Sequence, residues 1–222
     1  MTTWDPIWKN DSYSETSLRR IKASVKADSF AFFLDLKTED ICLDVGCGGG
    51  YVSKELSDRF NCKIIGCDTS IEAISFANEN NKMKNSNFIV ASATKLPFES
   101  DSVDAVVCVG VLEHVLDVEI ALSEIRRVLK PHGKLVVITS NYYSVMYIDR
   151  IIKQILGVWK YGYQKNWSPK KFSELLLNKG FKISNFKILQ GIGDFNNKTL
   201  LDKIINKVFA NWGRYIMFMG EK

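Results

Sequence analysis

The chain has 222 residues, of which 46% are hydrophobic and 25% are charged, and its formal net charge is +5. This composition is typical of one globular domain, and no apolar run approaches the roughly 18 residues that a membrane-spanning helix needs. The excess Lys and Arg residues are spread along the chain without clustering, so the charge does not favour nucleic acid as the substrate.

The first part of the chain, residues 1–36, predicts an aromatic arm followed by a helix. Trp4, Trp8 and Tyr13 lie in the arm, where they could cover a ligand or pin the terminus to the body of the protein. Helical spacing of apolar residues then extends over residues 14–36. The expected apolar face of this helix holds Leu18, Ile21, Val25 and Phe32.

Short β-rich runs alternate with helical patterns over residues 41–139, which is typical of a doubly wound parallel sheet with crossover helices. The predicted strands are 41–45, 63–67, 87–91, 103–109 and 134–139. The predicted helices are 51–60, 70–80 and 117–130, with Ser70 and Asp117 as N-caps. Pro131, His132 and Gly133 are expected to end the third of these helices and turn the chain into the fifth strand.

Further elements are expected after the fifth strand. Residues 142–159 predict an extra helix, and a second helix begins at Ser168-Pro169 and ends before Gly180. A strand over 181–189, a helix over 200–212 and a strand over 215–219 follow. The 200–212 helix places apolar residues opposite lysines, which suits either a membrane surface or core packing, and its position between two strands favours packing.

A glycine-rich loop connects the first predicted strand to its helix. It reads Asp44-Val45-Gly46-Cys47-Gly48-Gly49-Gly50. The absence of side chains at Gly46 and Gly48 lets the backbone approach a ligand, whose polar groups can meet the free amides at the start of the helix. A dinucleotide loop of the pattern G-x-G-x-x-G would need glycine where Tyr51 stands. Asp44 suits a ligand with an ammonium group better than a pyrophosphate.

Five segments in this order resemble the class I S-adenosylmethionine-dependent methyltransferases, in the subgroup of ubiquinone/menaquinone-type and small-molecule enzymes. The resemblance covers residues 41–139. Its segments are Leu43-Asp44-Val45-Gly46-Cys47-Gly48-Gly49-Gly50, Gly66-Cys67-Asp68-Thr69-Ser70, Leu96-Pro97-Phe98 with Val103-Asp104, Leu112-Glu113-His114-Val115, and Arg127-Val128-Leu129-Lys130-Pro131-His132-Gly133-Lys134-Leu135. It implies an α/β, Rossmann-like, doubly wound sheet of seven strands, mostly parallel with an antiparallel last strand.

The resemblance also implies which residues bind the methyl donor. They are Asp44, Gly46, Cys47, Gly48, Asp68, Thr69, Ser92, Ala93 and Val109. Asp68 ends the second strand, where a carboxylate can accept hydrogen bonds from both ribose hydroxyls; the alternative is an Asp that caps the next helix. At the adenine position the family has Asp-Ala and this chain has Ser92-Ala93, so the contact with the adenine amino group is altered, and Thr94 could share it.

In the family, the loop after the fourth strand lies between the donor and the acceptor. His114 could act there as a general base towards an acceptor hydroxyl, because imidazole titrates near neutral pH, or it could only fix the loop. Glu113 could orient His114 or cap the following helix. His132, in its turn, is expected to be structural.

The implied reaction transfers a methyl group from S-adenosylmethionine to an O, N or C atom of a small-molecule acceptor by in-line displacement. Acceptor selectivity is expected from parts outside the donor-binding core, which are rich in aromatic residues. Gly110, Tyr142 and Tyr143 are the predicted acceptor contacts. The aromatic residues are Trp4, Trp8, Tyr13, Tyr142, Tyr143, Tyr147, Trp159, Tyr161 and Tyr163.

The expected organisation is a single unit over residues 1–222. It comprises an N-terminal arm and helix at 1–36, a donor-binding core at 37–140, an acceptor-side helical insertion at 141–167, and the C-terminal part of the sheet at 168–222. Two alternatives stay open, an NAD-dependent oxidoreductase and a non-catalytic module that binds S-adenosylmethionine or S-adenosylhomocysteine. The oligomeric state is open as well.

The cysteines and the N-terminus indicate the compartment. The chain has five cysteines, without the C-x-x-C spacing or histidine partners of a zinc site, so reduced thiols and no resident metal are expected. The N-terminus lacks the features of a secretory signal, and cytoplasmic residence is expected. Contact with a membrane surface is not favoured.

Overall fold

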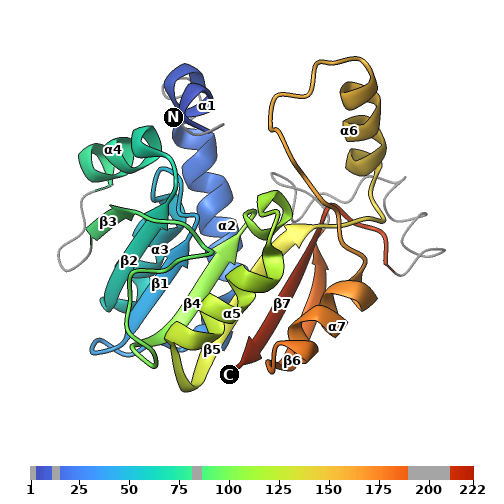
Figure 1. Cartoon of the computed structure of the whole chain (residues 1–222). Coiled ribbons are helices and arrows are strands. Elements are labelled where there is room, and N and C mark those ends of the chain that lie inside the picture. The colour runs from blue at the N-terminus through green and yellow to red at the C-terminus, as the bar shows by residue number, and fades with distance from the viewer. Residues whose placement is uncertain (1–3, 12–15, 82–86, 190–210) are drawn as a thin grey trace.

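The computed structural model describes residues 4–11, 16–81, 87–189 and 211–222. Its strands form one twisted sheet, with helices on both faces (Figure 1). The strands are β1 (Ile41–Val45), β2 (Lys63–Asp68), β3 (Asn87–Val90), β4 (Val103–Val109), β5 (Leu129–Ser140), β6 (Lys182–Leu189) and β7 (Tyr215–Glu221).

The sheet has seven strands in the order β3-β2-β1-β4-β5-β7-β6. The pairs β1–β2, β1–β4, β2–β3 and β4–β5 are parallel, whereas β7 is antiparallel to both β5 and β6. The expected fold class, a mostly parallel seven-stranded sheet with an antiparallel last strand, is confirmed. The strand order reverses between β1 and β4, and open α/β sheets bind ligands outside the carboxyl ends of the strands at such a point.

The helices begin and end close to the predicted positions. They are α1 (Asp5–Asp11), α2 (Thr16–Leu34), α3 (Tyr51–Phe60), α4 (Ile71–Asn80), the 3-10 helix η1 (Leu112–His114), α5 (Val118–Val128), α6 (Val145–Ile155) and α7 (Pro169–Asn178). Ser70 and Ser168 act as N-caps, because their hydroxyls accept hydrogen bonds from the amides of Ala73 and Lys171. Asp117 occupies the N-cap of α5 without a side-chain hydrogen bond.

Two predictions about local structure were wrong. The apolar face of α2 was expected to include Phe32, whose side chain is 98% exposed. The buried residues of α2 instead follow the spacing Ala23, Ala27, Phe30 and Leu34, which places Phe32 on the solvent side. The helix expected to reach residue 130 ends at Val128, and β5 begins at Leu129. The cause is Pro131, because a proline disfavours helical geometry at the residue before it.

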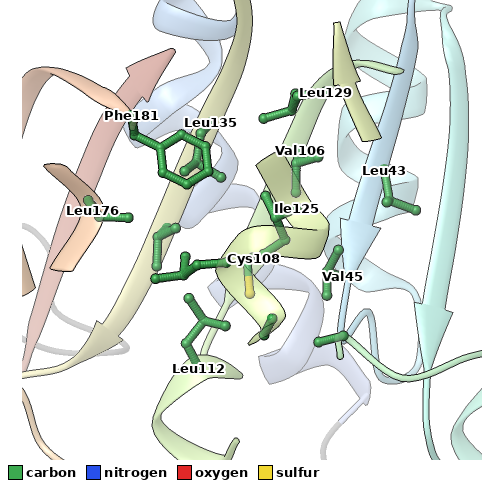
Figure 2. Packing of buried hydrophobic residues seen from close by; sticks show 14 of the residues in the cluster. Leu43, Val45, Val106, Cys108, Leu112, Ile125, Leu129, Leu135, Leu176 and Phe181 are labelled. Carbon is green, nitrogen blue, oxygen red and sulfur yellow. The ribbon is translucent and has the colours of Figure 1, made fainter. Parts of the chain in front are cut away.

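The core is divided by the sheet into two layers, as the alternation of side chains along each strand requires. Leu43, Val106 and Leu135 belong to the cluster on the face covered by α5 and α7, and Figure 2 shows Val106 beside Ile125 and Leu135 beside Phe181. The residues that alternate with these along each strand face the other layer, against α2 and α3. Both faces of the central strands are therefore buried, which explains their continuous apolar sequence.

The predicted helix over 200–212 falls mostly outside the described residues, and residues 211 and 212 are not helical. Tyr13 also lies outside them. Within the described ranges, the helices lack either the length or the apolar character needed to traverse a lipid bilayer.

Candidate active site

Three adjoining cavities lie at the carboxyl edge of the parallel strands. The central cavity, of about 360 Å³, is lined by residues that follow β1, β2, β3 and β4 and by the arm: Trp4, Trp8, Gly46, Gly48, Asp68, Thr69, Ala91, Ser92, Ala93, Gly110, Val111, His114 and Val115. Its volume lies in the range of small-molecule sites. Seven of the predicted donor and acceptor residues, together with His114, meet there: Gly46, Gly48, Asp68, Thr69, Ser92, Ala93 and Gly110.

The glycine-loop cavity, of about 260 Å³, shares Trp8, Gly46 and Gly48 with the central cavity. The other predicted donor residues, Asp44, Cys47 and Val109, line it. Every residue predicted to bind the donor therefore lies on one of two neighbouring cavities.

Two positions in the loop require glycine for steric reasons. Gly46 has a φ of +71°, and a Cβ there would lie 2.1 Å from the Val111 side chain. Its amide donates to the Cys67 carbonyl at 2.7 Å, which ties the loop to the end of β2. A Cβ on Gly48 would lie 2.7 Å from the Trp8 ring, so α1 packs directly on the loop.

Asp68 connects the glycine loop to α4. Its two carboxylate oxygens accept hydrogen bonds from the amides of Gly48 at 3.0 Å and Ser70 at 2.9 Å. Burial raises the pKa of the Asp68 carboxyl, and these backbone donors partly offset that effect. A carboxylate offers about four acceptor positions, so capacity remains for two hydroxyls of a ligand. The N-cap of α4 is Ser70 and not Asp68.

Asp44 is buried beneath the loop, with 2% of its surface exposed. Burial raises the pKa of its carboxyl to about 6, against the opposing hydrogen bond from the Ser53 hydroxyl at 2.6 Å. Nearby Asp68 raises this pKa further, whereas Lys26 lowers it.

Ser92 and Thr94 form a small hydroxyl pair after β3. Their oxygens are 2.8 Å apart, and the Thr94 amide donates to the Ser92 oxygen at 3.2 Å. One hydroxyl proton is used between the two side chains, so only one remains for a ligand.

His114 lies on the wall shared by the central cavity and the outer cavity described next. Its Nδ1 is 2.8 Å from the carbonyl oxygen of Tyr163. A carbonyl only accepts, so Nδ1 carries the proton and the neutral ring leaves Nε2 as a proton acceptor.

Glu113 neither orients His114 nor caps the following helix. Its carboxylate accepts hydrogen bonds from the hydroxyls of Thr139 at 3.0 Å and Ser140 at 2.9 Å, and so anchors η1 to β5.

The outer cavity, of about 400 Å³, lies between the carboxyl ends of β4 and β5 and the segment containing α6. It shares Trp4, Gly110 and His114 with the central cavity. Its further lining residues include Lys26, Glu113, Ser140, Asp149, Arg150, Lys153, Trp159, Tyr161, Gln164, Asn166, Arg214 and Tyr215.

Two predicted acceptor contacts lie elsewhere. Tyr142 and Tyr143 are 46% and 42% exposed and line none of these three cavities. Tyr142 packs against Tyr147 and Tyr143 instead. The sequence did not indicate that the polar residues Arg150, Gln164 and Arg214 line a common cavity, because their positions are far apart and only the folded chain brings them together.

The N-terminal arm closes one side of the central cavity. Trp4 packs edge-on against the His114 ring at 4.8 Å between centroids. The Ser70 hydroxyl donates to Asp5 at 2.7 Å, and Lys9 pairs with Glu72 at 3.0 Å, so α1 is attached to α4. Of the expected covering residues, Trp4 and Trp8 lie at the cavity.

Comparison with known proteins agrees with this geometry. A family model described as a methyltransferase domain matches residues 43–137. The chain is 30% identical over 189 residues to the ubiquinone biosynthesis O-methyltransferase of Rickettsia typhi, over 81% of this chain and 72% of the relative.

Two solved structures have the same fold at 19% identity. A SAM-dependent methyltransferase of Thermotoga maritima superposes with a TM-score of 0.70 over 99% of this chain and 98% of its own. The geranyl diphosphate C-methyltransferase of Streptomyces coelicolor, in complex with Mg²⁺, geranyl diphosphate and S-adenosylhomocysteine, superposes with a TM-score of 0.69 over 89% of this chain and 78% of its own.

The chain belongs to the class I S-adenosylmethionine-dependent methyltransferases. It is an enzyme whose cofactor is S-adenosylmethionine, from which it transfers a methyl group. The relatives and structures named above are methyltransferases, and none of them is an NAD-dependent oxidoreductase.

Proposed function

We propose that the central cavity binds the nucleoside part of S-adenosylmethionine and the glycine-loop cavity binds its amino-acid part. Asp68 would accept hydrogen bonds from the ribose hydroxyls, Asp44 would face the ammonium group, and Ser92, Ala93 and Thr69 would surround the base. The support is the arrangement of the walls, since all predicted donor residues lie on these two cavities. A further support is that a Cβ on Gly46 or Gly48 would collide with Val111 or Trp8, so only glycine lets the loop take this path along the two cavities.

We propose further that the outer cavity receives a small-molecule acceptor. The single observation that carries this assignment is the shared wall formed by Trp4, Gly110 and His114, where two ligands in neighbouring cavities would meet. When bound, S-adenosylmethionine supplies an activated methyl group on a cationic sulfur. The chain contributes orientation of the two ligands and exclusion of water by the Trp4 and Trp8 rings.

His114 is proposed to accept the proton of the acceptor through Nε2. We expect His114→Ala to lower the rate of transfer to a hydroxyl acceptor by about 100-fold, because a positioned general base contributes at least that much. The affinity for S-adenosylhomocysteine should not change. Rates at saturating substrates, measured with a labelled donor as a function of pH, test this role. His132→Asn is the control, because His132 is exposed near the start of β5, with a φ of +64° that Asn tolerates. An unaltered rate for His114→Ala would refute the role of His114 as general base.

The raised pKa of Asp44 makes donor affinity depend on pH. Above about pH 6 the carboxyl is ionised and can pair with the ammonium group, and below that value it is protonated. We expect the affinity for S-adenosylhomocysteine to fall by about tenfold from pH 7.5 to pH 5, and Asp44→Asn to bind weakly with little pH dependence. The stability of the ligand-free protein runs the other way: a raised folded pKa means that stability is lost as pH rises from about 4 to about 6. Isothermal titration calorimetry at several pH values measures the affinity. If the affinity fell equally with pH in the wild type and in Asp44→Asn, the placement of Asp44 beside the ammonium group would be contradicted.

The methyl-transfer reaction is tested by incubating the protein with labelled donor and an extract of host metabolites, followed by mass spectrometry of the products. A product that gains one labelled methyl group is the expected result. Donor binding without turnover on any hydroxyl, amine or activated-carbon acceptor would instead identify a non-catalytic binding module.

We propose residence in the cytoplasm, supported by the five unpaired cysteines, whose thiols are free in the described residues. We also propose that residues 1–222 act as one unit, since the arm, the core and the α6 segment each contribute to the walls of the site.

A further inference from the structure

The outer cavity has more cationic than anionic side chains. Its wall holds four basic side chains, Lys26, Arg150, Lys153 and Arg214, and two carboxylates, Glu113 and Asp149. Such an imbalance in a concave, partly desolvated space raises the local concentration of anions.

One carboxylate forms an ion pair with a cation of this wall, and the other acts on a second cation through its charge alone. Lys153 pairs with Asp149 at 2.7 Å. Lys26 is buried, which lowers its pKa, and the largest opposing electrostatic contribution comes from Glu113. Lys26 also lines the glycine-loop cavity, so it is shared between two sites. Arg150 and Arg214 are left without a carboxylate partner in the described part of the chain.

Arg150 gives the stronger indication of a bound anion, because it is buried, with 7% of its surface exposed. Its Nη1 donates to the Gln164 carbonyl at 2.7 Å and lies 3.4 Å from the Gln154 side-chain oxygen. Its Nε is buried without a hydrogen-bond partner in the described residues. A buried guanidinium without a counter-charge destabilises the fold, so a partner is expected from the ligand.

The guanidinium has one nitrogen left for a ligand. Nη2 of Arg150 makes no hydrogen bond within the described residues and is not among their buried unpartnered atoms, so it keeps some exposure, and Arg150 lines the outer cavity. The Tyr147 ring, 5.2 Å away, supports the guanidinium from the side. The side-chain oxygen of Asn166, on the same wall, is a second buried atom without a partner.

Arg214 reaches the same cavity from the segment before β7. Its guanidinium lies 5.4 Å from the centroid of the Tyr215 ring, another lining residue. Trp159 and Tyr161 add aromatic surface, with their rings 5.1 Å apart. The wall thus combines two guanidinium groups that have no carboxylate partner in the described residues with aromatic surface, which suits an anion attached to a ring or another apolar body.

We propose that the acceptor is an acid, with a carboxylate or a phosphate ester on an aromatic or apolar body, and that Arg150 and Arg214 bind its acid group in the outer cavity. This inference rests on the proposed function, because it takes the outer cavity as the acceptor site. The acid group would lie on the α6 side of the cavity and the atom to be methylated near His114, on the wall shared with the donor.

The test measures binding of simple probes to the full chain saturated with S-adenosylhomocysteine. Benzoate and phenyl phosphate are compared with neutral benzamide and with inorganic phosphate by isothermal titration calorimetry. We expect at least one of the two aromatic acids to bind at least about tenfold more tightly than benzamide, because charge-assisted hydrogen bonds to guanidinium are strong. The better of the two acids identifies the carboxylate or the phosphate ester as the preferred group. Equal binding of acid and amide, binding of none, or equally tight binding of inorganic phosphate would overturn the proposal.

The variants assign the preference to particular residues. Arg150→Met should reduce the preference for the acid to about twofold, and Arg150→Lys should retain part of it. Lys153→Met is the matched control, because this cation of the same cavity already pairs with Asp149, and it should keep the full preference. If Arg150→Met fails to fold by circular dichroism, Arg214→Met supplies the same test. A folded Arg150→Met or Arg214→Met protein that keeps the full preference would contradict the assignment. Unchanged affinity for S-adenosylhomocysteine in all variants separates this question from the proposed function, and failure of the wild-type chain to bind that product would refute the proposed function instead.

Discussion

Replacement of Gly46 by alanine should destabilise the protein by about 2–5 kcal/mol and weaken binding of S-adenosylhomocysteine by at least about tenfold. Two effects add at this position. The left-handed φ of +71° is unfavourable for any residue with a Cβ, and that Cβ would lie 2.1 Å from the Val111 side chain. Because the Gly46 amide also holds the loop to β2, movement that relieves the clash would displace the donor site. Denaturant unfolding and calorimetric titration measure the two effects.

A second glycine separates backbone strain from crowding. Gly157 has a φ of +69°, and a Cβ there would meet no atom within 4 Å. Gly157→Ala should therefore destabilise by about 1–2 kcal/mol and leave binding of S-adenosylhomocysteine unchanged. The double variant Gly46→Ala with Val111→Ala should recover the steric part of the loss only. If Gly46→Ala behaved like Gly157→Ala, the close approach of the loop to Val111 would have no functional consequence.

Removal of the Asp68 carboxylate should have the next largest effect. Asp68→Ala is expected to weaken binding of S-adenosylhomocysteine by about 1–3 kcal/mol, or about 5- to 150-fold, because the ribose hydroxyls would lose a charged acceptor. The amides of Gly48 and Ser70 would lose their partner as well. Asp68→Asn should lie between the wild type and Asp68→Ala, since an amide oxygen still accepts.

Asp104 provides the control for that variant. Its carboxylate also accepts from a backbone amide, that of Ile41 at 2.9 Å, and it pairs with Lys130 at 2.7 Å. It lies where β1 and β4 begin, at the edge of the sheet opposite the cavities. Asp104→Ala should lower stability and leave donor affinity as it is. Equal donor affinities for Asp68→Ala and Asp104→Ala would mean that Asp68 only supports the loop.

The sequence could predict that the proposed donor residues come together, because each of them is local to a single strand end. Asp44, Gly46 and Gly48 lie in one short stretch, Asp68 ends a strand, and His114 follows another. Parallel strands bring such ends to one edge of the sheet, so the order of motifs was enough to place them together.

The acceptor side could not be predicted in the same way. Lys26, Arg150 and Arg214 come from α2, α6 and the segment before β7, and no local pattern relates them. The position of Tyr142 and Tyr143 just after β5 predicts acceptor contacts, yet hydrogen bonds from the Asn141 side chain hold this turn against residues 211 and 213, away from the cavities. The exposed Phe32 is a similar case, since helical spacing alone did not reveal which face of α2 meets the sheet.

The glycine loop and Asp68 together are proposed to form the site for a sulfonium nucleoside, on which the other assignments depend. Isothermal titration calorimetry of the wild-type protein with S-adenosylmethionine and with NADH, under identical conditions, tests this directly. Saturable binding of one S-adenosylmethionine per chain, without measurable heat from NADH, is the predicted result. Tight binding of NADH with no binding of S-adenosylmethionine would contradict it.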